Sequence, residues 1–216
     1  MKKRINRIPN KFVEIACKGN NWDFSNKVLY DLCSKHPHHK NGTVIAAKIL
    51  LIGRVYAAAI ERRKDIDAND YMGDDFYFKK VVPELFNSDM DSWLHSLRRF
   101  RNITSNNISD VLRVHLWVTE LFSNISGLNK RSLASKYLHF HLPNLFYIYD
   151  SRVVSALSSL SSITGRLGPN RYEADNEYRK VFEKCLVVRG YVKDMYGVSL
   201  SPRHLDNLLL EIVESA

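Results

Sequence analysis

Apolar residues recur along the chain with the period of an α-helix in one segment after another. In the first half, this pattern predicts helices over residues 24–35, from Thr43 to about residue 64, and around residues 90–100. The second of these is apolar around most of its circumference, which is typical of a helix at the centre of a core. Residues 1–22 show little periodicity, and we expect them to form a basic arm.

The rest of the chain continues the helical pattern, apart from one acidic and turn-rich segment. That segment, residues 65–90, is predicted to form a loop with a short helix. The later helices are expected from Ser109 or Asn107 to about residue 123, and over residues 131–141, 151–162, 173–190 and 202–215. Since no segment alternates apolar and polar residues as a half-buried strand does, the predicted fold class is all-α, a bundle of about eight helices.

We expect this bundle to form two lobes with a cleft between them. The N-terminal helical lobe, with the basic arm, would span residues 1–106. The second lobe, residues 107–216, would contain a tight turn over residues 124–130 and the C-terminal helices. The length of 216 residues is sufficient for two small units that share a core.

Composition excludes several classes of protein. The most apolar stretch, residues 44–60, is interrupted by Lys48 and Arg54, so it is interpreted as a buried helix and not as a membrane span. The N-terminus lacks the apolar core of a signal peptide, and we expect a cytoplasmic protein with no membrane partner. The three cysteines are widely spaced and form no Cys-x-x-Cys motif, which disfavours a disulfide framework or a zinc site.

Charge is distributed unevenly along the chain. Residues 1–64 carry 14 basic and 4 acidic groups, residues 65–93 carry 2 and 8, and residues 94–152 carry 8 and 3. Residues 153–216 are balanced, with 8 of each. Two basic blocks on either side of an acidic one favour a polyanionic partner, because phosphate contacts release counterions.

The tight turn is the first candidate for binding chemistry. Gly127 and Asn129 tolerate left-handed backbone angles. A helix begins directly afterwards, beside Lys130 and Arg131. Its free N–H groups and its dipole point at one place, which favours a phosphate there.

A carboxylate follows some twenty residues later. Asp150 stands at the N-cap position of the helix predicted over residues 151–162. A separation of twenty residues is enough for one helix to end and for the chain to turn back. The carboxylate can therefore lie near the turn where a phosphate would bind. The alternative is that Asp150 only caps its helix.

Together these segments resemble the helix-hairpin-helix DNA glycosylases, and their 8-oxoguanine branch most closely. Ile125-Ser-Gly-Leu-Asn129 corresponds to the family's hairpin, and Tyr149-Asp-Ser-Arg-Val153 to its aspartate stretch. The resemblance implies that double-stranded DNA is the partner and that the hairpin amides hold its backbone. It also implies that Asp150 stabilises the oxocarbenium-like sugar as the base departs. A monovalent cation at the hairpin is the one cofactor that it suggests.

The position of the family's Schiff-base lysine, counted from Gly127, falls on Arg131, and an arginine cannot act as that nucleophile. Lys136 lies further along the helix, close to its apolar face, where desolvation would lower the pKa of the amine. We therefore predict Lys136 as the nucleophile, ahead of Lys130, which adjoins Arg131. The alternative is a monofunctional enzyme in which Asp150 positions a water molecule.

Further residues are candidates for contacts with the DNA. Those predicted to contact its backbone are Gly127, Asn129, Lys130, Arg131 and Arg152. Those predicted to line a pocket for an extruded base are Phe146, Tyr149, His139, His141 and Arg54. Core packing is the competing role for the aromatic residues and histidines, and an ion pair with Glu61 is the competing role for Arg54.

The resemblance thus implies a DNA glycosylase that removes a damaged or modified base, with AP-lyase activity if a lysine is the nucleophile. We expect the protein to be a monomer. It would act in repair, or in defence against phage DNA with modified bases. The alternative is a non-catalytic helical module that binds DNA or RNA. The motifs of P-loop ATPases, His-Glu-x-x-His metalloproteases and Gly-x-Ser-x-Gly hydrolases do not occur, and no metal site is expected.

Overall fold

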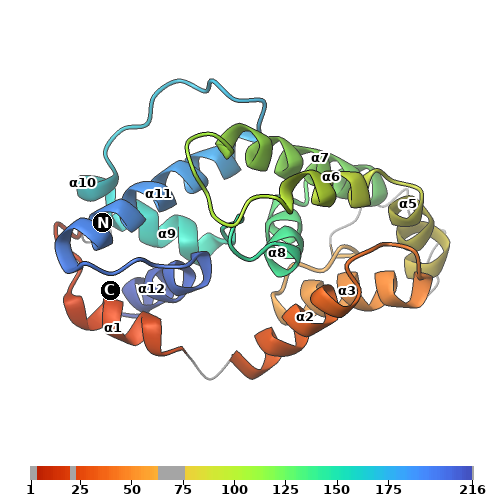
Figure 1. Cartoon of the computed structure of the whole chain (residues 1–216), viewed down its shortest axis with the longest axis horizontal. Coiled ribbons are helices and arrows are strands. Elements are labelled where there is room, and N and C mark those ends of the chain that lie inside the picture. The colour runs from red at the N-terminus through yellow and green to blue at the C-terminus, as the bar shows by residue number, and fades with distance from the viewer. Residues whose placement is uncertain (1–3, 20–22, 63–75, 216) are drawn as a thin grey trace.

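All regular secondary structure in the described part of the chain is helical (Figure 1). The structure, a computed structural model, describes residues 4–19, 23–62 and 76–215. The prediction of an all-α fold is confirmed. Within these ranges, no helix combines the length and the apolar character that a membrane span requires.

The helices follow one another through mostly short connections. The first half of the chain forms α1 (Asn10–Lys18), α2 (Asp23–Lys35), α3 (Gly42–Val55), the π-helical η2 (Tyr77–Val81), α5 (Val82–Phe86) and α6 (Met90–Leu97). The second half forms α7 (Ile108–Ser126), α8 (Arg131–His141), α9 (Ser151–Ser159), α10 (Ser161–Thr164), α11 (Asn176–Tyr196) and α12 (Pro202–Glu214).

Side-chain caps determine where several helices begin. In each, an oxygen of the residue before the helix accepts a hydrogen bond from a backbone N–H of the first turn. The capping residues are Asn41 of α3, Asp150 of α9, Asp175 of α11 and Ser201 of α12. The prediction that Asp150 caps a helix is confirmed. Helix α3, which was predicted to begin at Thr43, begins at Gly42 and is capped by Asn41.

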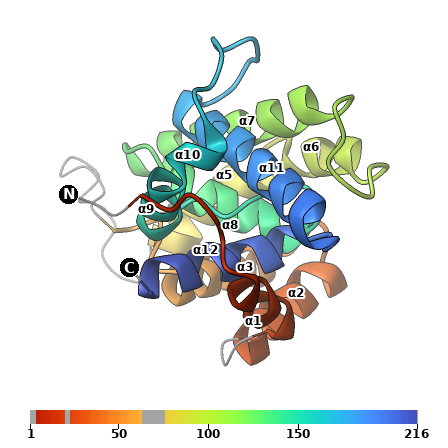
Figure 2. The ribbon, with the colours of Figure 1, turned by 90° about the vertical axis from the view of Figure 1, so that its left-hand side faces the viewer.

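Helix α8 lies at the centre of the molecule, where α2, α3 and α7 pack around it (Figures 1 and 2). Its residues from Leu133 to Phe140 are all buried, including the polar Ser135 and Lys136. Buried polar groups need partners, and Ser135 Oγ accepts a hydrogen bond from the N–H of Tyr149 at 2.9 Å. This bond ties α8 to the segment that precedes α9.

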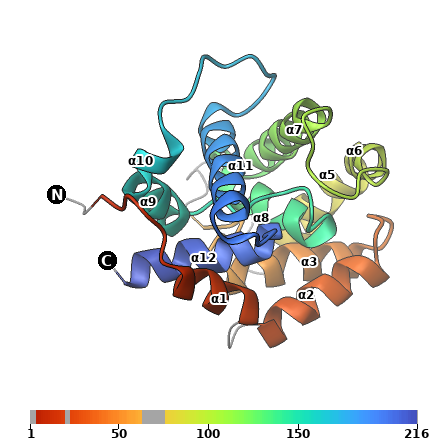
Figure 3. The same ribbon diagram turned by 60° about the vertical axis from the view of Figure 1, so that its left-hand side comes forward.

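The N-terminal segment is not the basic arm that was predicted. Residues 10–18 form α1, which packs along α12 and buries Phe12, Val13 and Ala16 (Figure 3). The first helix of the chain therefore lies beside the last one. This packing differs from a division into two lobes at residue 106, because α1 joins helices of the second half.

Helix α3 also ends earlier than predicted, at Val55. The chain turns back at Ala57, which has a φ of 51°, and the N–H of Ala58 donates to the carbonyl of Gly53 at 2.7 Å. Glycine is needed there because a Cβ on Gly53 would lie 2.9 Å from the Cα of Ala59. The close return of the backbone therefore ends α3 at Val55. The side chains that follow do not continue the faces of the helix.

Two further predictions concern α2 and the acidic segment. Phe24 and Val28 belong to the apolar pattern of the helix predicted over residues 24–35, but they are 70% and 58% exposed. The buried face instead carries Asn26 and Leu29. Residues 65–75 of the acidic segment lie outside the described residues, and most of its remainder forms η2 and α5.

Candidate active site

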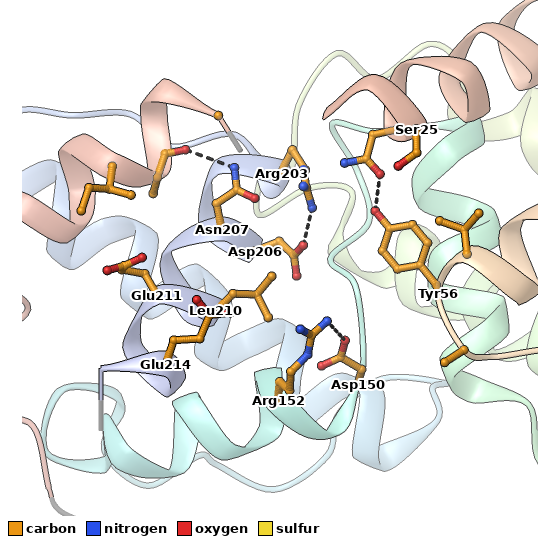
Figure 4. Close-up of a pocket in the computed structure, with 16 residues that line it drawn as sticks. Ser25, Tyr56, Asp150, Arg152, Arg203, Asp206, Asn207, Leu210, Glu211 and Glu214 are labelled. Carbon is orange, nitrogen blue, oxygen red and sulfur yellow. Dashed lines mark hydrogen bonds and ion pairs between the residues drawn. The ribbon is translucent and has the colours of Figure 1, made fainter. Parts of the chain in front are cut away.

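A cavity of about 430 Å³ lies between α1 and α12 on one side and α2 and the end of α3 on the other (Figure 4). Its volume is in the range of pockets that bind small molecules. Its polar lining includes Asn26, Tyr56, Asp150, Arg152, Arg203, Asp206 and Asn207. Side chains from distant parts of the sequence therefore meet around one space.

Asp150 faces this cavity from the start of α9. Its Oδ1 accepts a hydrogen bond from the N–H of Val153 at 2.9 Å, and its Oδ2 lies 3.8 Å from the guanidinium of Arg152. One oxygen thus caps the helix while the other lies next to a cation. The side chain of Arg152 is 55% exposed, so it is accessible to a ligand at the mouth of the cavity.

Lys136 is buried behind the wall of the cavity. Its Nζ donates a hydrogen bond to Ser132 Oγ at 2.8 Å and lies 5.8 Å from the ring centre of Tyr56, which lines the cavity. Burial lowers the pKa of Lys136, while the charges of Asp150 and Asp206 act in the opposite direction. The amine therefore loses its proton more readily than an ordinary lysine, as predicted for a desolvated nucleophile.

A polar cluster on α12 was not predicted from the sequence. Arg203 and Asp206 form an ion pair at 2.6 Å, and Asn207 Nδ2 donates to the carbonyl of Ala16 at 3.2 Å. Burial raises the pKa of Asp206 to about 6, although Arg203 lowers it. The signal that was available is a charged residue within an apolar helical pattern, directly after Leu205.

The turn between α7 and α8 approaches the segment that precedes α9. Gly127 ends α7 in the left-handed conformation, with a φ of 73°. Ser132, in the first turn of α8, donates through Oγ to the carbonyl of Tyr149 at 3.0 Å. Asn129 Oδ1 accepts a hydrogen bond from the N–H of Arg131 at 3.0 Å, so one of the N–H groups that were expected to bind phosphate is already satisfied.

Lys130 and Arg131, which were predicted to contact phosphates, are held by groups of the protein itself. Lys130 Nζ donates to the carbonyl of Arg62 at 2.7 Å. Arg131 makes two hydrogen bonds to the carboxylate of Asp175, one of them 2.7 Å long. The prediction that these two side chains bind DNA stays a prediction, but both cations already have partners within the fold.

Phe146 and His139 belong to the core and not to a base pocket. Both side chains are fully buried. His139 Nδ1 is 2.8 Å from the carbonyl oxygen of Phe146, and its Nε2 is 2.6 Å from the hydroxyl of Tyr30. Because both ring nitrogens have partners inside the protein, the imidazole has no free group for a ligand.

Tyr149, His141 and Arg54 also lie outside the lining of the cavity. Tyr149 is half-buried and is anchored to α8 through its backbone. The ring of His141 stacks on that of His39, with their centres 5.4 Å apart. Arg54 forms an ion pair with Glu61 at 2.5 Å beside a separate pocket. This ion pair is the competing role that the sequence analysis gave for Arg54. All three assignments to the base pocket are therefore corrected.

Comparison of the chain with protein-family models, with curated proteins and with solved structures found no match. A function is therefore inferred from the geometry of the cavity. That geometry combines a carboxylate at the cavity, a second and deeply buried carboxyl group, and a desolvated amine, which belong to Asp150, Asp206 and Lys136.

We predict that the pair of Arg131 and Asp175 stabilises the fold and contributes little to DNA binding. The two side chains are 22% and 8% exposed, and breaking a buried pair costs on the order of 3 kcal/mol. Burial raises the pKa of Asp175, but hydrogen bonds from Arg131 outweigh it and hold the pKa below its ordinary value. A double-mutant cycle of Arg131→Gln and Asp175→Asn, measured by urea unfolding, should give a coupling energy at neutral pH.

The stability that this pair contributes is present above the ordinary carboxyl pKa of about 4 and is lost as the pH falls through the lower pKa of the folded state. The coupling energy should therefore disappear in acid. A coupling energy near zero at neutral pH, together with a large loss of DNA affinity in Arg131→Gln, would contradict the structural role.

A second prediction concerns Asp206. Its pKa is about 6 in the folded chain and about 4 in an unfolded one. Binding of a proton to Asp206 therefore stabilises the folded chain. This contribution is fully present below about pH 4 and is lost as the pH rises through 6. Relative to the wild type, Asp206→Asn should gain up to about 3 kcal/mol in free energy of unfolding between pH 4 and pH 7. Urea unfolding at several pH values measures this, with Asp194→Asn, an exposed carboxylate of α11, as the control. An equal pH dependence in both variants would refute the assignment.

Proposed function

We propose that the chain is a DNA glycosylase that extrudes a damaged or modified base from duplex DNA and cleaves its N-glycosidic bond in the cavity beside Asp150. The observation that carries the proposal is the meeting of Asp150, a cavity of about 430 Å³ and the buried amine of Lys136. Enzymes that act on a base need such a pocket, because the reacting atoms cannot be reached inside the base stack.

In this proposal, Asp150 stabilises the positive charge that develops on the sugar. When the bond between C1′ and the base nitrogen breaks, the electron pair leaves with the base. A carboxylate that is already fixed near the sugar stabilises the resulting cation without reorganisation. The bond from Val153 to Oδ1 supports this role, since it holds the carboxylate in one orientation.

The sugar cation is then captured by a nucleophile in one of two ways. In a monofunctional enzyme, Asp150 orients a water molecule and accepts its proton. In a bifunctional enzyme, the neutral amine of Lys136 attacks C1′, and the Schiff base that follows permits AP-lyase cleavage. The lowered pKa of Lys136 supports the second route. Because the side chain is 2% exposed, this route also requires the residues around Tyr56 to move.

The charge of the chain supports duplex DNA as the partner. The net charge is +9, and Arg99, Arg101 and Arg152 are exposed. Phosphate contacts by such residues release counterions, so the affinity should depend on salt. The same reaction serves the repair of damaged DNA and defence against phage DNA with modified bases.

A non-catalytic module that binds nucleic acid is the second candidate. The capping bond between Asp150 and Val153 favours it, since a cap gives Asp150 a structural role. A cap does not explain why Lys136 and Asp206 are buried around the same cavity, because binding of the phosphate backbone needs exposed cations. The catalytic proposal accounts for all three residues and is therefore preferred.

We predict that Asp150→Asn retains DNA binding and loses base excision by at least about 100-fold, the usual cost of removing one preorganised electrostatic group. Asparagine caps helices as well as aspartate does, so α9 should remain intact. Duplexes that carry 8-oxoguanine, uracil, alkylated bases or hypermodified pyrimidines are incubated with each protein, and alkali-labile sites are quantified.

The control for this experiment is Asp194→Asn, which removes the same charge from the exposed surface of α11. It should excise bases as the wild type does. If the wild type binds duplex DNA but releases no base from any of these substrates, the non-catalytic module replaces the glycosylase as the proposed function.

The role of Lys136 is tested by trapping a Schiff base with borohydride. We expect the wild type to form a covalent adduct with the substrate strand, and Lys136→Met to form none, because methionine fills the same volume without an amine. The matched control is Lys130→Met, at a lysine whose pKa burial also lowers. If the adduct is lost only in Lys130→Met, Lys130 and not Lys136 is the nucleophile. If an active wild type forms no adduct, the enzyme is monofunctional.

A further inference from the structure

Asn26 of α2 carries an unused hydrogen-bond donor at the cavity. Its side chain is 3% exposed and forms part of the lining. Its Oδ1 accepts a hydrogen bond from the hydroxyl of Tyr56 at 2.6 Å, and this bond orients the amide. Its Nδ2 is buried and has no hydrogen-bond partner among the residues that the structure describes. Since buried donors in folded proteins nearly always have a partner, a ligand in the cavity would supply the missing acceptor.

The charges around the cavity disfavour an anion as that acceptor. The carboxyl groups that line it are those of Asp150, Asp206, Glu211 and Glu214, and the guanidinium groups are those of Arg152 and Arg203 (Figure 4). With this excess of acids, a phosphate or carboxylate deep in the cavity would be repelled. A carbonyl oxygen on a neutral ring accepts a hydrogen bond without adding charge. The ring of Tyr56, beside Asn26, offers an aromatic surface against which a planar ring can pack.

We propose that Asn26 selects the base in the cavity by donating a hydrogen bond from Nδ2 to a ring carbonyl oxygen of a neutral purine or pyrimidine. A base with an amino group at that position sets donor against donor and binds less tightly. Tyr56 acts here as a positioning residue, because its hydroxyl holds Oδ1 of the amide. The biological meaning of this selection rests on the proposed glycosylase function, whereas the binding itself does not require excision.

The experiment measures the binding of free bases to the full chain by nuclear magnetic resonance titration. Hypoxanthine and adenine share one ring system. They differ at C6, which carries a carbonyl or an amino group, and at N1, which carries a hydrogen only in hypoxanthine. The wild type should bind hypoxanthine roughly tenfold more tightly, as expected for one added hydrogen bond. Asn26→Asp replaces the donor by an acceptor and should remove or reverse the preference. Equal affinity of the wild type for the two bases, or no binding of either, would overturn the proposal.

A matched control is Asn124→Asp, the same substitution at an exposed position of α7 outside the lining of the cavity. It should keep the preference of the wild type. If Asn26→Asp does not fold, Tyr56→Phe serves instead, because it removes only the hydroxyl that orients the amide and should weaken the preference. A preference that survives Tyr56→Phe unchanged would then count against the proposal.

A preference of the wild type for adenine would show that the amide presents its oxygen to the cavity, which would also overturn the proposal. Because free bases have no glycosidic bond, these measurements do not depend on catalysis. Failure of excision in the DNA experiments therefore leaves this test intact, and failure here leaves the glycosylase proposal to its own test.

Discussion

The burial of one ammonium group in the central helix is the constraint on which the candidate site depends. Moving a charge out of water costs several kcal/mol unless close partners compensate for it. The partners of Lys136 Nζ are neutral groups, the hydroxyl of Ser132 and the ring of Tyr56, while Asp150 and Asp206 act on it by their charges alone. A methionine or leucine would fill the same space without this cost, so the stability of the fold alone does not account for the buried amine.

The packing of the chain ends brings the two carboxyl groups to that lysine. Asp150 is fixed by its capping bond at the start of α9, and Asp206 lies on the buried face of α12, which packs against α9 and α1. The bond from Asn207 to the carbonyl of Ala16 fastens α12 to α1. The cavity thus depends on the first and last helices lying together. Loss of the packing of α12 against α1 or against α9 would open one wall of the cavity.

Local signals account for what the sequence predicted, and tertiary contacts account for what it did not. The bounds of α8, the cap formed by Asp150 and the desolvation of Lys136 follow from residues within a turn or two, so periodicity and capping rules predicted them. The ion pair of Arg131 joins residues 44 positions apart, and no local pattern indicates such a partner. Asp206 directly follows Leu205 within an apolar helical pattern, but only the packing of α12 shows that its carboxyl group is buried. The return of the chain over Gly53 likewise directs Tyr56, and not Arg54, to the cavity.

The capping role of Asp150 does not compete with a catalytic one, because the two roles use different oxygens. Oδ1 is occupied by the backbone of α9, whereas Oδ2 lies 3.8 Å from the guanidinium of the exposed Arg152. A carboxylate held by a helix N-terminus keeps its position while charge develops near it, which is what electrostatic stabilisation of a sugar cation requires. A carboxylate that served only as a cap would have no need of a cavity, a second carboxyl group and a desolvated amine around it. In the proposed glycosylase, the cap would fix the orientation of Asp150 before a substrate binds.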